Sequence, residues 1–206
     1  YWLRDMDRQN VEVIEHLNAE NTYTDEVLAN TKELQEELFQ ELKSRVKQND
    51  VSVPYLYDGY FYYTRYEEGK EYPIYCRKQG SLELAEQVML DVNELAKGFS
   101  YYQVASNNIS TNNQILAFSE DTLSRRIYTI RFKNLTTGEF LEDRIEQCAG
   151  GCVWANDNKT VFYVRKDETT LRSFKVFKHV LGTKPEVDTE VFHEHDVTFN
   201  VGCWKN

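Results

Sequence analysis

The sequence has few cysteines and no long hydrophobic run. Four cysteines among 206 residues are too few for a disulfide scaffold, and they predict free, mostly buried thiols in a reducing compartment. No run approaches the ~18 consecutive apolar residues that a transmembrane helix needs. We therefore expect no membrane partner.

Sequence motifs for common chemistry are missing as well. The chain holds no Gly-x-Ser-x-Gly, which carries the nucleophile of α/β-hydrolases. Its nine glycines form neither a Gly-x-Gly-x-x-Gly fingerprint nor a phosphate-binding loop. From the residues alone we assign no catalytic residue, no cofactor, no cofactor-binding residue and no metal ligand.

An excess of positive charge is also missing. The chain has 24 basic and 34 acidic residues, a formal net charge of −10, and no basic stripe interrupts this balance. Such a surface repels phosphate backbones, which excludes a nucleic-acid partner. A negative field attracts cationic peptides, although solubility alone is the simpler explanation of the charge.

The first fifty residues have a helical pattern. From Arg8 to Gln48 there is no proline and no glycine, and the apolar residues recur at steps of three, four and seven. The pattern predicts two helices, at about 8–29 and 31–48, with a capping-box-like start at Asn30 and Glu33. The second helix carries an apolar stripe that needs a partner, made of Leu34, Leu38 and Leu42.

The pattern changes to β-structure after residue 50. Strand-like runs rich in aromatic and β-branched residues alternate with polar turns. Pro73 predicts that its strand either lies at a sheet edge or begins there. The expected strands are Tyr60–Thr64, Tyr72–Arg77, Gln114–Phe118, Ile127–Phe132, Phe140–Leu141, Thr160–Val164 and Phe174–Lys178.

These strands form an internal repeat. Val161 follows Ile115 by 46 residues, and Phe174 follows Tyr128 by the same offset. The turns 111–113 and 156–158 precede the two equivalent first strands. A period of about 40–50 residues with four short strands per unit is typical of a β-propeller blade.

The predicted fold is therefore mainly β, with a helical segment at 1–50 and an incomplete β-propeller at 51–206. We expect blades at about 58–110, 112–155 and 158–200, the first carrying an insertion at Leu82–Gly98 with a helical turn at Asp91–Ala96. Two to three blades cannot close a ring of the usual four to eight. We therefore expect the chain to be a truncated part of a larger fold.

Two short motifs remain as candidates for chemistry. His193 and His195 alternate along a strand and share one face, but two ligands are too few for a metal site without a third. Cys148 and Cys152 lack the spacing of a zinc site, and we expect them to fill small gaps beside Trp154. The glycines between these two cysteines predict a tight approach between blades.

The order of several segments resembles the oligopeptidase B branch of the prolyl oligopeptidase family. The segments run along essentially the whole chain: Tyr1–Asp5, Leu17–Thr24, Asp50–Pro54, Gly59–Tyr63, Gly69–Arg77, Val153–Asp157 and Thr170–Thr183. The last segment resembles this branch more than the prolyl-specific enzymes. Each segment alone is weak evidence, whereas their order and spacing together are specific.

The resemblance implies a cytoplasmic serine peptidase that cleaves short peptides after Lys or Arg. It implies a seven-bladed propeller that gates an α/β-hydrolase domain, which would be this chain's partner and would carry the catalytic triad beyond residue 206. The fragment alone is then expected to be inactive. The alternatives are a fragment of a prolyl-specific oligopeptidase and a stand-alone propeller-type interaction module. Self-association through exposed strand edges is a further expectation.

Overall fold

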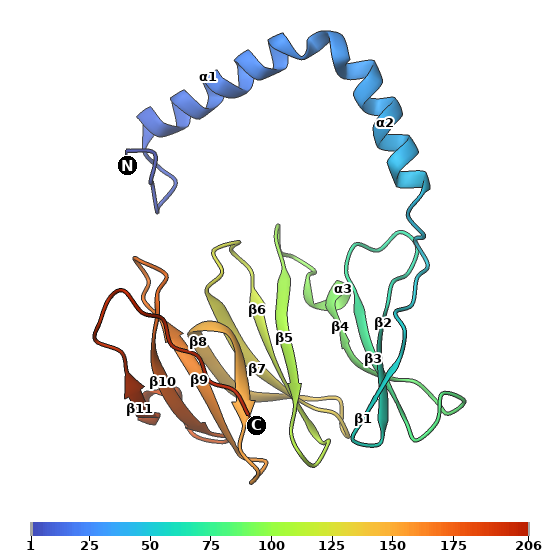
Figure 1. The fold of residues 1–206 in the computed structure, drawn as a ribbon, viewed down its shortest axis with the longest axis vertical. Coiled ribbons are helices and arrows are strands. Elements are labelled where there is room, and N and C mark those ends of the chain that lie inside the picture. The colour runs from blue at the N-terminus through green and yellow to red at the C-terminus, as the bar shows by residue number, and fades with distance from the viewer. Residues whose placement is uncertain (1, 206) are drawn as a thin grey trace. The chain divides into compact units, whose positions relative to one another are not determined.

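The computed structural model describes residues 2–205, so the motif residue Tyr1 lies outside the described part. The chain divides into two compact units, Tyr1–Gln48 and Asn49–Asn206. Each unit is described by itself. The first contains only helices, and the second contains the strands (Figure 1).

The helical unit contains α1 (Val11–Val27), the 3-10 turn η1 (Ala29–Thr31) and α2 (Lys32–Ser44). Helix α1 begins later than predicted because the Asn10 side chain caps it, accepting hydrogen bonds from the backbone N–H groups of Glu12 and Val13. The predicted capping box is wrong. Asn30 lies in the 3-10 turn, and Thr31 occupies the N-cap position of α2 without a side-chain cap.

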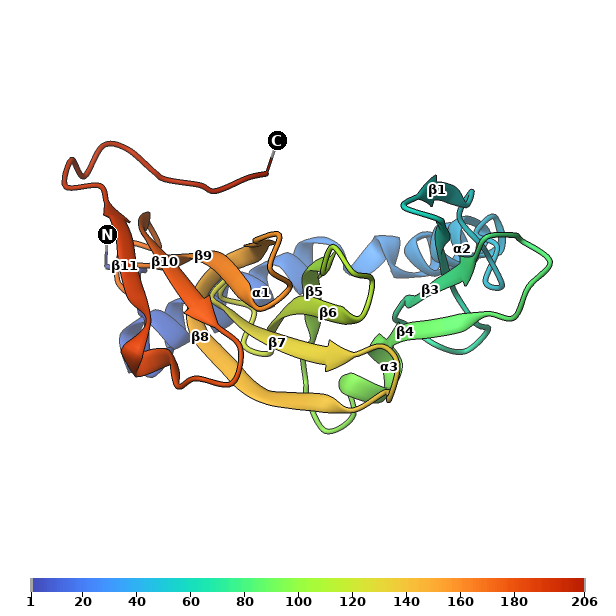
Figure 2. The ribbon, with the colours of Figure 1, turned by 90° about the horizontal axis from the view of Figure 1, so that it is seen from below.

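The β unit contains two antiparallel sheets (Figures 1 and 2). The four-stranded sheet has the order β1-β2-β3-β4 and the seven-stranded sheet the order β11-β10-β9-β8-β7-β6-β5. The strands are β1 (Tyr55–Tyr57), β2 (Tyr60–Arg65), β3 (Ile74–Gln79), β4 (Gln87–Asp91), β5 (Gln103–Ile109), β6 (Ile115–Asp121), β7 (Tyr128–Asn134), β8 (Phe140–Trp154), β9 (Thr160–Lys166), β10 (Ser173–Val180) and β11 (Thr189–His193). The short helices α3 (Val92–Leu95) and η2 (Pro185–Val187) lie in the connections.

Strand β8 belongs to two blades. Its first part, up to Cys148, pairs with β7, and its last part, from Cys148 to Trp154, pairs with β9. The ladder is interrupted between Cys148 and Cys152, next to Gln147, whose φ is 59°. The seven-stranded sheet is thus two four-stranded units that share one strand, and with β1–β4 the chain forms three blades.

The predicted blade boundaries are wrong by one strand. The blades begin at β1, β5 and the last part of β8, which are the innermost strands. The sequence pattern did not predict these strands, because they are short or polar and have no clear hydrophobic alternation. The segment Leu82–Gly98 is not an insertion, since it contains β4 and the predicted helical turn, which is α3. Pro73 immediately precedes β3, which is an interior strand of its sheet. Of the two predictions for this proline, the edge strand is wrong and the strand that begins there is correct.

Two apolar clusters hold adjacent blades together. One joins β2 and β4 of the first blade to Leu116, Phe118 and Leu135 of the second. The other joins Ala117 and its neighbours on β7 and β8 to Trp154 and β9 of the third blade. Successive side chains of β6 therefore enter different clusters, as the alternation of a strand requires.

A repeated turn links the blades at one end of the sheets. Asp58, Asn113 and Asn158 follow the innermost strands of the three blades, and all have positive φ, a conformation that Asn and Asp tolerate well. Asn113 Nδ2 donates to Asp58 Oδ2 at 2.6 Å. The Oδ1 of Asn158 accepts from Thr111 Oγ1 at 2.7 Å and from the Asn112 backbone N–H at 2.8 Å. Each of the two pairs of neighbouring blades is therefore joined by an Asn side chain.

We expect Asn158→Ala to reduce the free energy of unfolding by roughly 1–2 kcal/mol, because it removes the acceptor of two hydrogen bonds and a residue suited to positive φ. Asn158→Asp keeps the acceptor, and Asn158→Gly keeps the backbone freedom. Urea denaturation of the three variants separates the two contributions. Wild-type stability of the alanine variant would show that this turn does not hold the blades together.

Candidate functional site

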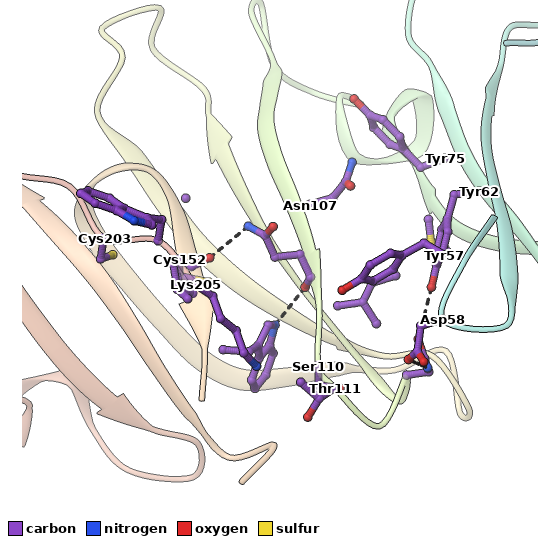
Figure 3. Close-up of a pocket in the computed structure, with 18 of the residues that line it drawn as sticks. Tyr57, Asp58, Tyr62, Tyr75, Asn107, Ser110, Thr111, Cys152, Cys203 and Lys205 are labelled. Carbon is purple, nitrogen blue, oxygen red and sulfur yellow. Dashed lines mark hydrogen bonds between the residues drawn. The ribbon is translucent and has the colours of Figure 1, made fainter. Parts of the chain in front are cut away.

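The candidate site is a hollow of about 1180 Å³ on the inner side of the blades (Figure 3). Its walls come from β1 and β2, from β5 with the turn that follows it, from the last part of β8, and from the segment Val201–Lys205. The first three walls belong to successive blades. The hollow therefore occupies the position of the central channel of a propeller.

The wall formed by the first blade is rich in tyrosine. Tyr57, Tyr62 and Tyr75 line it, and the hydroxyl of Tyr62 donates to Asn113 Oδ1 at 3.2 Å (Figure 3). Burial raises the pKa of Tyr62 and that of Tyr75 above the ordinary value. Both phenols are therefore neutral near pH 7 and keep their O–H donors.

The opposite wall is held by bonds between side chains and backbone. Asn108 Nδ2 donates to the carbonyl of Cys152 at 3.1 Å, and Trp154 Nε1 donates to the carbonyl of Asn108 at 3.0 Å (Figure 3). These bonds join β5 to the last part of β8, so neighbouring inner strands do not need to pair through their backbones. Asn107 also lines the hollow.

The C-terminal segment completes the lining. The Val201 N–H donates to the carbonyl of Ser173, and the Cys203 thiol lies 3.6 Å from the carbonyl of Phe162. The segment thus crosses β10 and β9 toward the turn after β8 (Figure 2). There the Lys205 ammonium donates to the Asn156 side-chain oxygen.

The chemistry of the lining suits an extended peptide. Among its polar side chains phenol, amide and hydroxyl groups predominate, and formal charge comes from Asp58 and Lys205. Such groups bind backbone N–H and C=O without selecting one side chain. The Cys152 thiol also lines the hollow, but burial raises its pKa to about 12, so it is protonated and a weak nucleophile near pH 7.

The structure brings together the residues of both candidate motifs, but the prediction that both histidines lie on a strand is wrong, because β11 ends at His193 and His195 follows it. The rings of His193 and His195 lie 4.0 Å apart, and His193 Nδ1 lies 3.8 Å from Glu190 Oε1. Partial loss of hydration and the neighbouring His195 lower the pKa of His193. Across residues 2–205 no group of three or more His, Cys, Asp or Glu side chains is arranged to hold a metal ion.

Cys148 and Cys152 pack in the cluster that contains Trp154, as predicted. The predicted close approach at the intervening glycines is also found. A Cβ on Gly150 would lie 3.0 Å from Ala105 Cβ and 3.2 Å from the Tyr128 ring. A Cβ there would require β5 or the Tyr128 ring to move by a few tenths of an ångström, so the absence of a side chain at Gly150 permits the close approach.

Sequence reasoning missed the residues of the inner strands that line the hollow, such as Tyr57, Asn107 and Asn108. The polar sequence of Ser106–Asn108 is typical of a loop. It is polar because its strand, β5, is only partly buried. The one available signal was the repeat itself, which places a fourth strand before each matched turn. No local pattern marks His179 either, a buried residue with two carboxylate partners.

Comparisons with known proteins agree on one family. Residues 1–205 match the sequence profile described as prolyl oligopeptidase, N-terminal beta-propeller domain. Dipeptidyl aminopeptidase BI of Pseudoxanthomonas mexicana is 45% identical over 100% of this chain and 31% of its own length. Protease 2 of Moraxella lacunata is 36% identical over 98% of the chain and 30% of its own length.

A solved structure gives the same result. Oligopeptidase B from Leishmania major superposes with a TM-score of 0.91 and 36% identity, over 100% of this chain and 29% of that protein. The chain thus spans less than a third of the relatives it matches. The fold is the predicted partial propeller preceded by helices. Among the described residues no helix is long and apolar enough to cross a membrane.

We expect the four thiols to differ in reactivity. Cys76, Cys148 and Cys152 are buried, and burial is the largest cause that raises the pKa of each, to about 12 for Cys76 and Cys152. Cys203 is partly exposed. Alkylation with iodoacetamide near pH 8, followed by peptide mass spectrometry, should label Cys203 first and the others only after denaturation. Equal labelling of all four in the native chain would contradict the buried packing.

Proposed function

Because the chain belongs to the prolyl oligopeptidase family, we propose that it is the propeller portion of a serine-type oligopeptidase of the cytoplasm and that it controls which peptides reach the catalytic domain. The observation that carries the proposal is the hollow along the innermost strands, lined by groups that bind peptide backbone. The catalytic domain would lie in the remainder of the parent protein.

The size of the hollow supports selection by size. Pockets for small ligands occupy about 300–1000 Å³, and the hollow of about 1180 Å³ is only slightly larger. A space of this size accommodates a short extended peptide, and we propose that a channel of this width, closed by the further blades of the parent, excludes a folded domain. A propeller that admits only such chains protects folded proteins from the peptidase.

The exposed apolar stripe of α2 supports a covering partner within the same parent protein. Leu34, Leu38 and Leu42 are 54%, 47% and 63% exposed. Water-exposed leucines at helical spacing lose the burial that stabilises an amphipathic helix. We propose that the α/β-hydrolase domain of the parent covers this stripe, and that the fragment by itself self-associates through exposed strand edges.

For the substrate, we propose short peptides cleaved after Lys or Arg. The support is the 36% identity to oligopeptidase B from Leishmania major and the net charge of −10, which favours the approach of cationic peptides. The second candidate is removal of dipeptides, favoured by the 45% identity to a protein named dipeptidyl aminopeptidase BI.

Hydrolysis assays on the full-length parent distinguish the candidates. We expect a chromogenic peptide that has Arg before the cleaved bond and a blocked amino terminus to be cleaved at least tenfold faster than the same peptide with Pro at that position. We expect no hydrolysis by the 206-residue chain. Dependence on a free amino terminus would favour the dipeptidyl aminopeptidase, and preference for Pro would reject both assignments.

The control of access predicts a length-dependent effect of obstructing the hollow. In the parent, Asn107→Trp should reduce kcat/KM for a peptide of about ten residues several-fold, because the indole fills space along the route. A minimal chromogenic substrate should be affected much less. Thr136→Trp, in an exposed turn outside the hollow, is the matched control. Equal effects of Asn107→Trp on both substrates would contradict passage through the hollow.

A further inference from the structure

The seam between the second and third blades contains a fully buried histidine, His179 on β10. Its Nδ1 lies 2.7 Å from Asp188 Oδ1, and its Nε2 lies 3.0 Å from Asp143 Oδ1. Asp143 is on β8 in the second blade, and Asp188 follows η2 in the third. The three side chains, named here the His179 cluster, therefore link the two blades.

Both carboxylates already act as acceptors for other donors. Asp143 Oδ1 accepts the backbone N–H of Gly182 at 2.6 Å, and Asp188 Oδ2 accepts the Tyr163 hydroxyl at 2.9 Å. Burial raises the pKa of Tyr163, while the Arg165 guanidinium lowers it and the bond to Asp188 raises it further. Tyr163 therefore stays protonated and donates to Asp188.

This arrangement restricts the protons on the imidazole. A neutral imidazole has a single N–H, so one of its nitrogens would face a carboxylate oxygen with a lone pair. Two buried carboxylates on either side of a neutral ring would also leave two negative charges with Arg165 as the one nearby cation among the groups that face the cluster, and Arg165 reaches the cluster through the Tyr163 hydroxyl. An imidazolium donates through both nitrogens and neutralises one of those charges.

We propose that His179 is a buried imidazolium that joins the second and third blades, so that the seam between them weakens as the medium becomes alkaline. The two carboxylates that face the ring are Asp143 from β8 and Asp188 from the connection to β11. The other titratable or charged groups that face the cluster are Cys148 from β8 and Tyr163 and Arg165 from β9. The ring of Phe132 on β7 stacks on the imidazole with 6.2 Å between the ring centroids. Cys148 and Tyr163 are neutral near pH 7, because burial raises the pKa of each. The proposal concerns the fold of the chain and does not depend on the peptidase assignment.

The proposal fixes the direction of the pH dependence. An unfolded histidine loses its proton near pH 6.5, whereas the folded chain would keep the proton on His179 above that pH. Folding then takes up one proton, and the stability contributed by the cluster is full below about pH 6.5 and declines above it. The contribution of the cluster to the folding equilibrium constant should fall by up to about tenfold per pH unit above that pH.

The direct experiment is long-range ¹H–¹⁵N NMR of the 206-residue chain at about pH 8. The sequence has four histidines, and the other three, His16, His193 and His195, can be replaced by Gln, which leaves the signals of His179 alone. Both ring nitrogens should resonate as protonated nitrogens. One protonated and one unprotonated nitrogen would overturn the proposal.

Denaturation provides a second, independent measurement. The difference in folding equilibrium constant between wild type and His179→Gln should shrink as the pH rises above about 6.5, by up to about tenfold per pH unit. The control is His16→Gln in the helical unit, at a partly buried histidine that contacts neither carboxylate of the cluster, and it should show no such trend. A constant difference between wild type and His179→Gln would also overturn the proposal, and if that variant does not fold, the NMR measurement remains decisive.

Discussion

Each four-stranded blade has two faces, and neither face is stable in water unless a neighbouring blade covers it. The second blade shows the consequence, since Leu116 and Phe118 of β6 pack toward the first blade while Ala117 packs toward the third. Nearly every residue of β6 is buried as a result. The first and third blades have a neighbour on one side within this chain, and several of their apolar side chains remain exposed, such as Tyr55 and Val191.

Polar groups at the seams are arranged to complement this apolar packing. The Asn and Asp side chains of equivalent turns join the blades at one end. The Asn108 and Trp154 bonds join the inner strands, and the His179 cluster joins the second and third blades through buried charge. Apolar burial supplies most of the stabilisation, whereas buried polar contacts of this kind fix one relative placement of the blades.

The same division of roles explains the character of the hollow. The middle strands of each blade are apolar because both of their faces are covered, and the innermost strands remain partly exposed and carry Asn, Ser and Tyr. These side chains leave hydrogen-bonding groups along the inner walls. Such groups can hydrogen-bond to extended backbone without selecting one side chain, which is the property that the proposed passage for varied peptides requires.

The sequence by itself determined the change from helix to strand near residue 50, the strands of the repeat and the turns between them, because these depend on local periodicity and turn chemistry. The resemblance identified the family for the same chain, since ordered motifs survive without knowledge of contacts. The sequence did not determine the innermost strands, the sharing of β8 between two blades or the partners of His179. Asp143 and His179 lie 36 residues apart and meet only when two blades stack. Such contacts are decided by tertiary packing, because no local pattern records which distant residue will share a buried seam.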